Sequence, residues 1–229
     1  MKNQCLEPAV VLIKKIYALY DTAIKHFDGV CEKKCSSCCT CNVTLTSLEA
    51  GFLIAALTQQ EKEKLLTRLK QYFPQKRYIP KMTSNMFARL CMEDGDVPDE
   101  HNDPSWGECP LLVDDMCSIY DARPFGCRAL MSQINCRQKG YAQIPPIVLT
   151  INTLFLQTIE QMDHQGIFGN LSDMLTLFLM NKPFKTVLDQ VKKKQDARFL
   201  FNEKIVVLMI PPEHREKVRP LLGKLANLS

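Results

Sequence analysis

The chain has few glycines and histidines, and it lacks any long apolar run. No segment approaches the roughly 18 apolar residues that a transmembrane helix needs, so we expect no membrane span. Its nine glycines form no glycine-rich loop of the kind that cradles nucleotide phosphates. Its four histidines are scattered without paired ligand spacing. These absences disfavour a membrane protein, a nucleotide-loop enzyme and a histidine-based metal site.

The N-terminal stretch also lacks the features of a signal peptide. Lys14 and Lys15 interrupt its apolar residues, and no small-residue cleavage site follows, so it predicts an amphipathic helix. We therefore expect a cytoplasmic protein whose thiols stay reduced. With 229 residues, 46% of them hydrophobic, the chain can bury an ordinary core without disulfides. The odd total of eleven cysteines also leaves at least one unpaired in any all-disulfide scheme.

Positive charge is concentrated in the C-terminal part of the chain. Residues 182–229 contain eleven Lys and Arg but only five Asp and Glu. A basic segment of this kind can bind acidic proteins or nucleic acid. No aromatic residues alternate with the lysines as they do in single-strand binders, which disfavours nucleic acid. We expect solvated helix faces, with a protein partner as the alternative.

Helix-start signals and apolar spacing predict a mostly α fold. Thr46 and Thr58 each open a Thr-x-x-Glu capping box, which marks the start of a helix. Helical spacing predicts helices over about residues 8–26, 47–57, 59–73, 85–92, 147–164, 171–180, 184–194 and 213–225. The segment KIVVLMI, residues 204–210, indicates one short strand. We expect a compact single domain over residues 1–229, of about six to eight helices, with a basic helical segment at 182–229.

What the chain has in excess is cysteine, in two groups about 70 residues apart. The first is CEKKCSSCCTC, in which thiols two to four residues apart can point at one ion. A disulfide between the adjacent Cys38 and Cys39 would be strained, which favours metal binding by at least one of them. The second group has wider intervals and would close the site from across the fold. The predicted ligands, from two loops, are Cys31, Cys35, Cys38, Cys39, Cys109, Cys117 and Cys127.

The other cysteines carry weaker signals. Cys41 is the last cysteine of the first group and Cys136 the last of the second, and the sequence leaves open whether either binds metal. Cys5 and Cys91 are isolated, and we interpret them as small buried hydrophobes. The arginines among the second group, Arg123, Arg128 and Arg137, either offset thiolate charge or are ordinary surface residues.

Several separated motifs occur together in this chain. They are C-x3-C-x2-CC from Cys31, VTLTSLEA at residues 43–50, CPLL at 109–112, CSIYDARP at 117–124 and GCR at 126–128. In this order they resemble the bacterial cysteine-cluster family named CxxCxxCC, described as a zinc- or iron-chelating domain; Ser132 and Cys136 also match one branch of it. The resemblance covers about residues 30–136 and implies metal binding by cysteine. The first interval has three residues where the family name has two.

We therefore predict a metalloprotein whose cysteines hold an iron–sulfur cluster or zinc, with the metal-site core at about 30–136. Iron–sulfur is favoured because more than four thiols are present. One alternative is a protein-lysine N-methyltransferase, because flagellin lysine N-methylases carry a related cluster. Another is non-catalytic metal storage, delivery or partner binding. The spacing C-x3-C-x2-C also occurs in radical S-adenosylmethionine enzymes, but the strand-helix alternation of those enzymes is missing after Cys41.

No catalytic residue is assigned from the sequence. Tyr120 and Asp121 lie beside Cys117 and can face an open metal position. We expect them instead to pack and to form a turn into Pro124, because Asp-Ala-Arg-Pro is typical of a turn.

Overall fold

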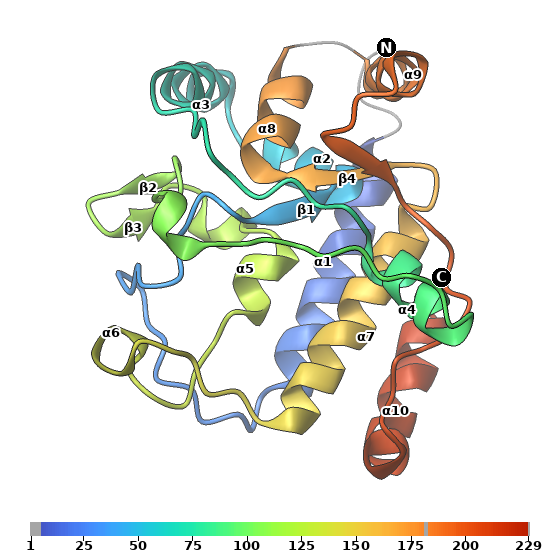
Figure 1. Cartoon of the computed structure of the whole chain (residues 1–229). Coiled ribbons are helices and arrows are strands. Elements are labelled where there is room, and N and C mark those ends of the chain that lie inside the picture. Colours follow the sequence, from blue (N-terminus) through green and yellow to red (C-terminus); the bar gives the residue numbers. More distant parts are fainter. Residues whose placement is uncertain (1–5, 181–182, 229) are drawn as a thin grey trace.

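The computed structural model describes residues 6–180 and 183–228, and within these ranges it is built mainly of helices (Figure 1). The ten α-helices are α1 (Leu6–Ala23), α2 (Ser47–Ala55), α3 (Gln59–Gln71), α4 (Ser84–Met92), α5 (Phe125–Ala129), α6 (Cys136–Lys139), α7 (Pro146–Met162), α8 (Leu171–Leu179), α9 (Phe184–Lys194) and α10 (Arg215–Ala226). The strands are β1 (Thr44–Thr46), β2 (Leu112–Val113), β3 (Met116–Cys117), β4 (Ile167–Asn170) and β5 (Phe199–Phe201). Three 3-10 turns are η1 (Pro104–Trp106), η2 (Tyr120–Ala122) and η3 (Pro212–His214).

All eight helices predicted from the sequence are present, with ends within a few residues of the expected ones. Both capping boxes form, at Thr46 with Glu49 and at Thr58 with Glu61. The expected total of six to eight is nevertheless too low, because α5 and α6 are additional. These helices have only five and four residues, so they are too short to show helical spacing.

The strand predicted at residues 204–210 is wrong. This segment is irregular, and its backbone groups pair with side chains of α7 instead of with another strand. The Gln157 side chain donates to the Val207 carbonyl (2.8 Å) and accepts from the Met209 amide (3.0 Å). Gln161 accepts from the Ile205 amide (2.7 Å). Two glutamine side chains therefore take the place of the neighbouring strand with which these backbone groups would otherwise pair.

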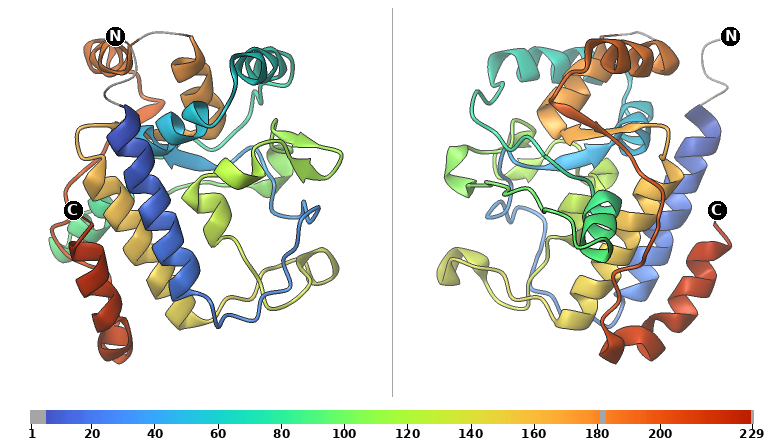
Figure 2. Two further views of the ribbon diagram at one scale, coloured as in Figure 1. Left: turned by 180° about the vertical axis from the view of Figure 1, so that it is seen from behind. Right: turned by 45° about the vertical axis from the view of Figure 1, so that its right-hand side comes forward.

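The core is centred on α1 and α7, which lie side by side in both figures (Figures 1 and 2). Fully buried aromatic rings join these helices to α5. The Tyr20 ring contacts Phe125 (centroids 4.7 Å apart) and Phe155 (5.1 Å) edge to face, and Phe125 stacks on Phe155 (5.7 Å). Such pairs contribute about 0.5–1.5 kcal/mol each beyond the burial of their area. Helix α5 is thus tied to the most tightly packed part of the molecule.

A small antiparallel sheet with strand order β1-β4-β5 lies beside the ends of these helices. Strands β1 and β4 lead directly into α2 and α8, which pack together. The side chain of Asn170 caps α8 through the Ser172 amide and also donates to the Cys41 carbonyl (2.8 Å). The sheet therefore anchors the end of the first cysteine segment. None of the helices in the described ranges is both long and apolar enough to cross a membrane.

Candidate metal centre

The two cysteine segments meet through backbone hydrogen bonds. The Cys109 amide donates to the Cys39 carbonyl (2.9 Å), and the Cys41 amide donates to the Gly107 carbonyl (2.9 Å). A β-bridge between Thr40 and Glu108 lies between these bonds. Gly107 has φ +146°, a conformation that favours glycine. The residues before Cys109 therefore run beside the end of the first cysteine group and bring Cys39 and Cys109 together.

Cys117 is carried by the short hairpin of β2 and β3. It pairs with Leu112 across the hairpin, whose turn is formed by Asp114 (φ +49°) and Asp115 (φ +60°). Two successive residues with positive φ are typical of a tight two-residue hairpin turn. The Arg68 guanidinium of α3 donates to the carbonyl of Leu112 and to that of Pro110. These bonds hold the hairpin against the helical body.

Cys127 lies on α5, not on a loop as the sequence predicted. The expected turn into Pro124 is present, because η2 leads into Pro124, which caps α5. Phe125 is fully buried, and its amide donates to the Glu49 carboxylate (2.7 Å). Glu49 also accepts from the Tyr17 hydroxyl (2.9 Å) and from the Thr46 amide (2.9 Å). The buried carboxylate therefore connects α1, α2 and α5, and it positions the helix that carries Cys127.

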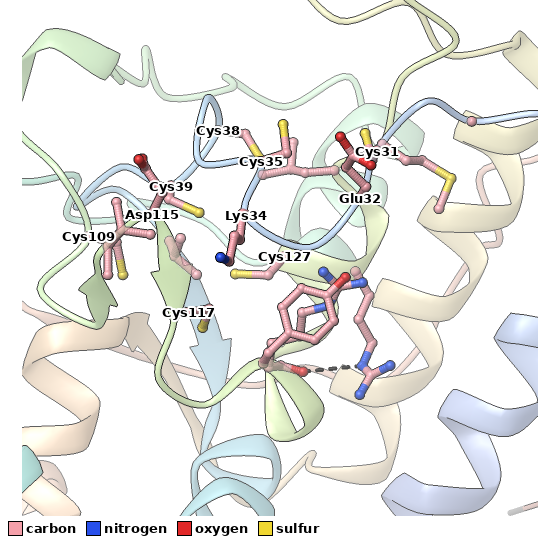
Figure 3. A pocket seen from close by; sticks show the side chains of 18 of the residues that line it. Cys31, Glu32, Lys34, Cys35, Cys38, Cys39, Cys109, Asp115, Cys117 and Cys127 are labelled. Carbon is pink, nitrogen blue, oxygen red and sulfur yellow. Dashed lines mark hydrogen bonds between the residues drawn. The ribbon is translucent and has the colours of Figure 1, made fainter. Parts of the chain in front are cut away.

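The seven predicted ligands line one cavity of about 270 Å³ (Figure 3). Cys31, Cys35 and Cys38 are exposed, whereas Cys39, Cys109, Cys117 and Cys127 are partly buried. The ten cysteines in the described ranges are all free thiols. Among the residues that the structure describes, no three Cys, His, Asp or Glu side chains are arranged closely enough to hold an ion. The fold therefore brings the thiols to one cavity. Their side chains have to move closer together before they can coordinate a metal ion.

The remaining cysteines lie in different surroundings. Cys41 is buried outside this cavity, and its thiol is within 3.5 Å of the Asn42 side-chain oxygen and of the Lys76 carbonyl. Cys136 lines a neighbouring cavity together with Cys31 and Cys35. Cys91 is exposed on α4, so its interpretation as a buried hydrophobe is wrong. Cys5 lies outside the described residues.

The thiols of the cavity differ in how easily they ionise. A hydrogen bond from Cys39 lowers the pKa of Cys38 to about 6, and the same bond raises the pKa of Cys39. Burial raises the pKa of Cys109 to about 12 and also raises the pKa values of Cys117 and Cys127. Cys38 thus ionises more easily than an ordinary cysteine, and the buried thiols become thiolates when a metal cation replaces their protons.

Cationic side chains line the same cavity. The Arg123 guanidinium stacks on the Tyr120 ring (4.3 Å to the centroid), and its buried Nε has no hydrogen-bond partner. Arg128 donates to the carbonyls of Arg123 (3.2 Å) and Asp121 (2.8 Å), which fixes this turn. Of the three arginines expected near the thiols, Arg123 and Arg128 line the cavity. The third, Arg137, is exposed and lines the neighbouring cavity.

Sequence reasoning missed several other residues of the cavity wall. Lys34 lies within the first cysteine group with φ +71°, and it lines the cavity together with Asp115 of the hairpin turn (Figure 3). Apolar wall is supplied by Phe27 and Met131. Lys34 and Asp115 had a signal in the sequence, because each lies between two predicted ligands. Phe27 and Met131 lie outside the predicted ligands of their segments and had none.

A comparison with family models matches residues 30–146 to the family CxxCxxCC, described as "Putative zinc- or iron-chelating domain". The match covers both cysteine groups, including Cys136, and extends to the first residue of α7. No curated protein and no solved structure matches the chain.

Proposed function

The chain belongs to the CxxCxxCC family, and from this premise we propose that it holds an iron–sulfur cluster through thiolates from both cysteine segments. Cys38 or Cys39 from the first segment would bind together with Cys109, Cys117 and Cys127 from the second. The observation that supports this proposal is the shared cavity, because its lining includes thiols from segments that are far apart in the chain.

The donor set and its surroundings fit such a centre. Cysteine thiolates are the usual ligands of iron–sulfur clusters, and four of them around a cluster or a dication leave net negative charge. Arg123, Arg128 and Lys34 line the cavity and offset that charge. The Nε of Arg123 is a buried donor without a partner, and a ligated sulfur is an acceptor of the kind it lacks. When bound, a cluster would supply single-electron transfer.

Iron–sulfur is favoured over zinc for two reasons. A structural zinc ion needs four ligands, whereas five thiols are available from Cys38, Cys39, Cys109, Cys117 and Cys127 alone. The cavity of about 270 Å³ also offers more room than one ion occupies. Zinc remains the alternative that the family description names. Lysine methylation has no support from the family description.

The proposal is tested by metal and sulfide analysis with a visible spectrum on anaerobically purified protein. We expect iron and acid-labile sulfide with a broad absorption band, and loss of both in Cys127→Ser. Cys38→Ser, alone or combined with Cys39→Ser, distinguishes which member of the adjacent pair binds. Cys91→Ser is the matched control, because this exposed thiol lies on α4 and lines neither cavity. Colourless protein with stoichiometric zinc contradicts the cluster, and unchanged metal content in Cys127→Ser contradicts the two-segment site.

A further inference from the structure

A second cavity, of about 180 Å³, adjoins the first and is also lined by cysteines. Its thiols are Cys31 and Cys35, which border both cavities, and Cys136, which borders only this one. The other five thiols of the metal centre do not line it. In Figure 3, Cys31 lies on the right of the labelled cysteines, and Cys109 and Cys117 lie on the left. We call Cys31, Cys35 and Cys136 the outer group. The inner group is Cys38, Cys39, Cys109, Cys117 and Cys127.

Hydrogen bonds hold the two segments of the outer group together. The Val30 amide donates to the Ser132 carbonyl (2.9 Å), and Arg137 donates to the Ser36 hydroxyl (3.3 Å). These bonds flank Cys31 and Cys35 on one segment and precede and follow Cys136 on the other. Ser132 is fully buried, and its hydroxyl accepts from the Gln143 amide (3.0 Å), which fixes the second segment. The outer thiols therefore share a cavity because of contacts independent of the inner centre.

We propose that Cys31, Cys35 and Cys136 form a second metal site, which takes one thiophilic divalent cation of the zinc type. Three thiolates and a dication carry one net negative charge, and Glu32, which also lines the cavity, adds a second. The three basic residues of the same lining, Lys33, Lys34 and Arg137, offset these charges. Each thiol releases its proton to solvent as it binds. The fourth position is open to water, because Cys31 and Cys35 are exposed.

The first cysteine segment has the freedom that closure around an ion requires. Between Cys31 and Cys35 the only internal backbone bond is from the Cys35 amide to the Glu32 carbonyl (3.1 Å), and no helix or strand constrains the segment from residue 28 to residue 39. Cys136 is the first residue of α6, where the Asn135 side chain caps the helix. Cys136 thus gives the site one thiol on a capped helix, and Cys31 and Cys35 give it two thiols on a segment outside helices and strands.

The test is an anaerobic titration of reduced, metal-free protein with cobalt(II), whose thiolate charge-transfer band reports each bound equivalent. We expect two equivalents for the wild type and for the control Cys91→Ser. Cys136→Ser should lose one equivalent and keep the other, and Cys31→Ser, on the exposed segment, should do the same. Far-UV circular dichroism of each variant checks the fold. A single equivalent in the wild type, or two equivalents in both Cys136→Ser and Cys31→Ser, overturns the second site.

Cys127→Ser separates this inference from the proposed function. Loss of the other equivalent in Cys127→Ser, with the outer equivalent retained, supports both sites. If Cys127→Ser keeps two equivalents while Cys136→Ser loses one, the outer site stands, because four inner thiols remain to bind cobalt. The inner centre is then decided by the iron and sulfide analysis of Cys127→Ser. If only Cys127→Ser loses metal, the inner centre stands and the outer site is wrong.

Discussion

At the scale of single residues, the adjacent cysteines have opposite roles. Cys39 donates a hydrogen bond to Cys38, which lowers the pKa of Cys38 to about 6, whereas the pKa of Cys39 is raised. The hydrogen bond therefore favours the thiolate form of Cys38 and the thiol form of Cys39. This is a physical reason for the two neighbouring thiols, because the thiolate is the form that a metal binds first.

The ionisation of Cys38 predicts a pH profile for its alkylation. The thiolate is the nucleophile, so the rate with iodoacetamide in metal-free protein should rise with pH and reach half of its maximum near pH 6. Cys39→Ala removes the donor and should move that midpoint upward, toward the ordinary cysteine value of about 8.5, which slows alkylation at pH 7 several-fold. Mass spectrometry of quenched samples measures the rate at each site. Exposed Cys91 is the internal reference, and an unchanged midpoint in Cys39→Ala contradicts the hydrogen-bond assignment.

At the scale of elements, two capping boxes of the same sequence type have different structural roles. Glu61 caps α3 on the surface, and its carboxylate bonds only with Thr58 among the groups that the structure describes. Glu49 caps α2 in the interior, where it also accepts from Tyr17 of α1 and from Phe125 of α5. The same motif is therefore a local cap at one helix and a junction of three helices at the other.

This difference predicts unequal losses of stability. Glu49→Ala leaves buried donors without an acceptor and should lower the free energy of unfolding by about 2–3 kcal/mol. Glu61→Ala removes an exposed cap and should lower the free energy of unfolding much less than Glu49→Ala does. Urea unfolding of the metal-free variants measures both values. Because Glu49 positions α5, Glu49→Ala should also weaken metal retention, and equal costs for the two variants would count against the junction.

At the scale of the whole molecule, the apolar core is formed mainly by helices. Fully buried residues of α1 and α7, such as Ile13 and Phe155, belong to a cluster of buried side chains that, among the described residues, contains no cysteine. Cys109, Cys117 and Cys127 of the second segment pack against this cluster, and α5 and the sheet also join the cysteine segments to it. The packing of the helices against one another is thus largely separate from the thiols.

This separation predicts the response to metal removal. A chelator should leave the far-UV circular dichroism of the helices nearly unchanged, because apolar burial stabilises them. Amide hydrogen exchange should accelerate in residues 28–41 and 107–140, where thiolate bonds would hold the segments together. Cys127→Ser treated in the same way is the control. Cooperative loss of helix on chelation would mean that metal binding is coupled to folding of the whole domain, and it would weigh against easy metal delivery.

A feature of this fold could be predicted where its signal is local in the sequence, and could not where it depends on distant contacts. Helical spacing and capping boxes are local signals, so all eight long helices are found where the sequence predicts them. Helices α5 and α6 escape prediction because one turn of helix is stabilised by its contacts and not by its spacing. Residues 204–210 are irregular because Gln157 and Gln161, 44 to 52 residues earlier in the chain, satisfy their backbone groups.

For the candidate site, the sequence by itself determined the donor chemistry: closely spaced thiols in one segment, a second group further on, and arginines among them. Only the tertiary structure decided which thiols share a cavity. It places Cys41 in the interior, brings Cys136 to one cavity with Cys31 and Cys35, and adds Lys34 and Met131 to the cavity lining. The reason is physical. Ligand type is a property of the residue, whereas proximity depends on long-range contacts such as those of Cys109 with Cys39 and of Val30 with Ser132.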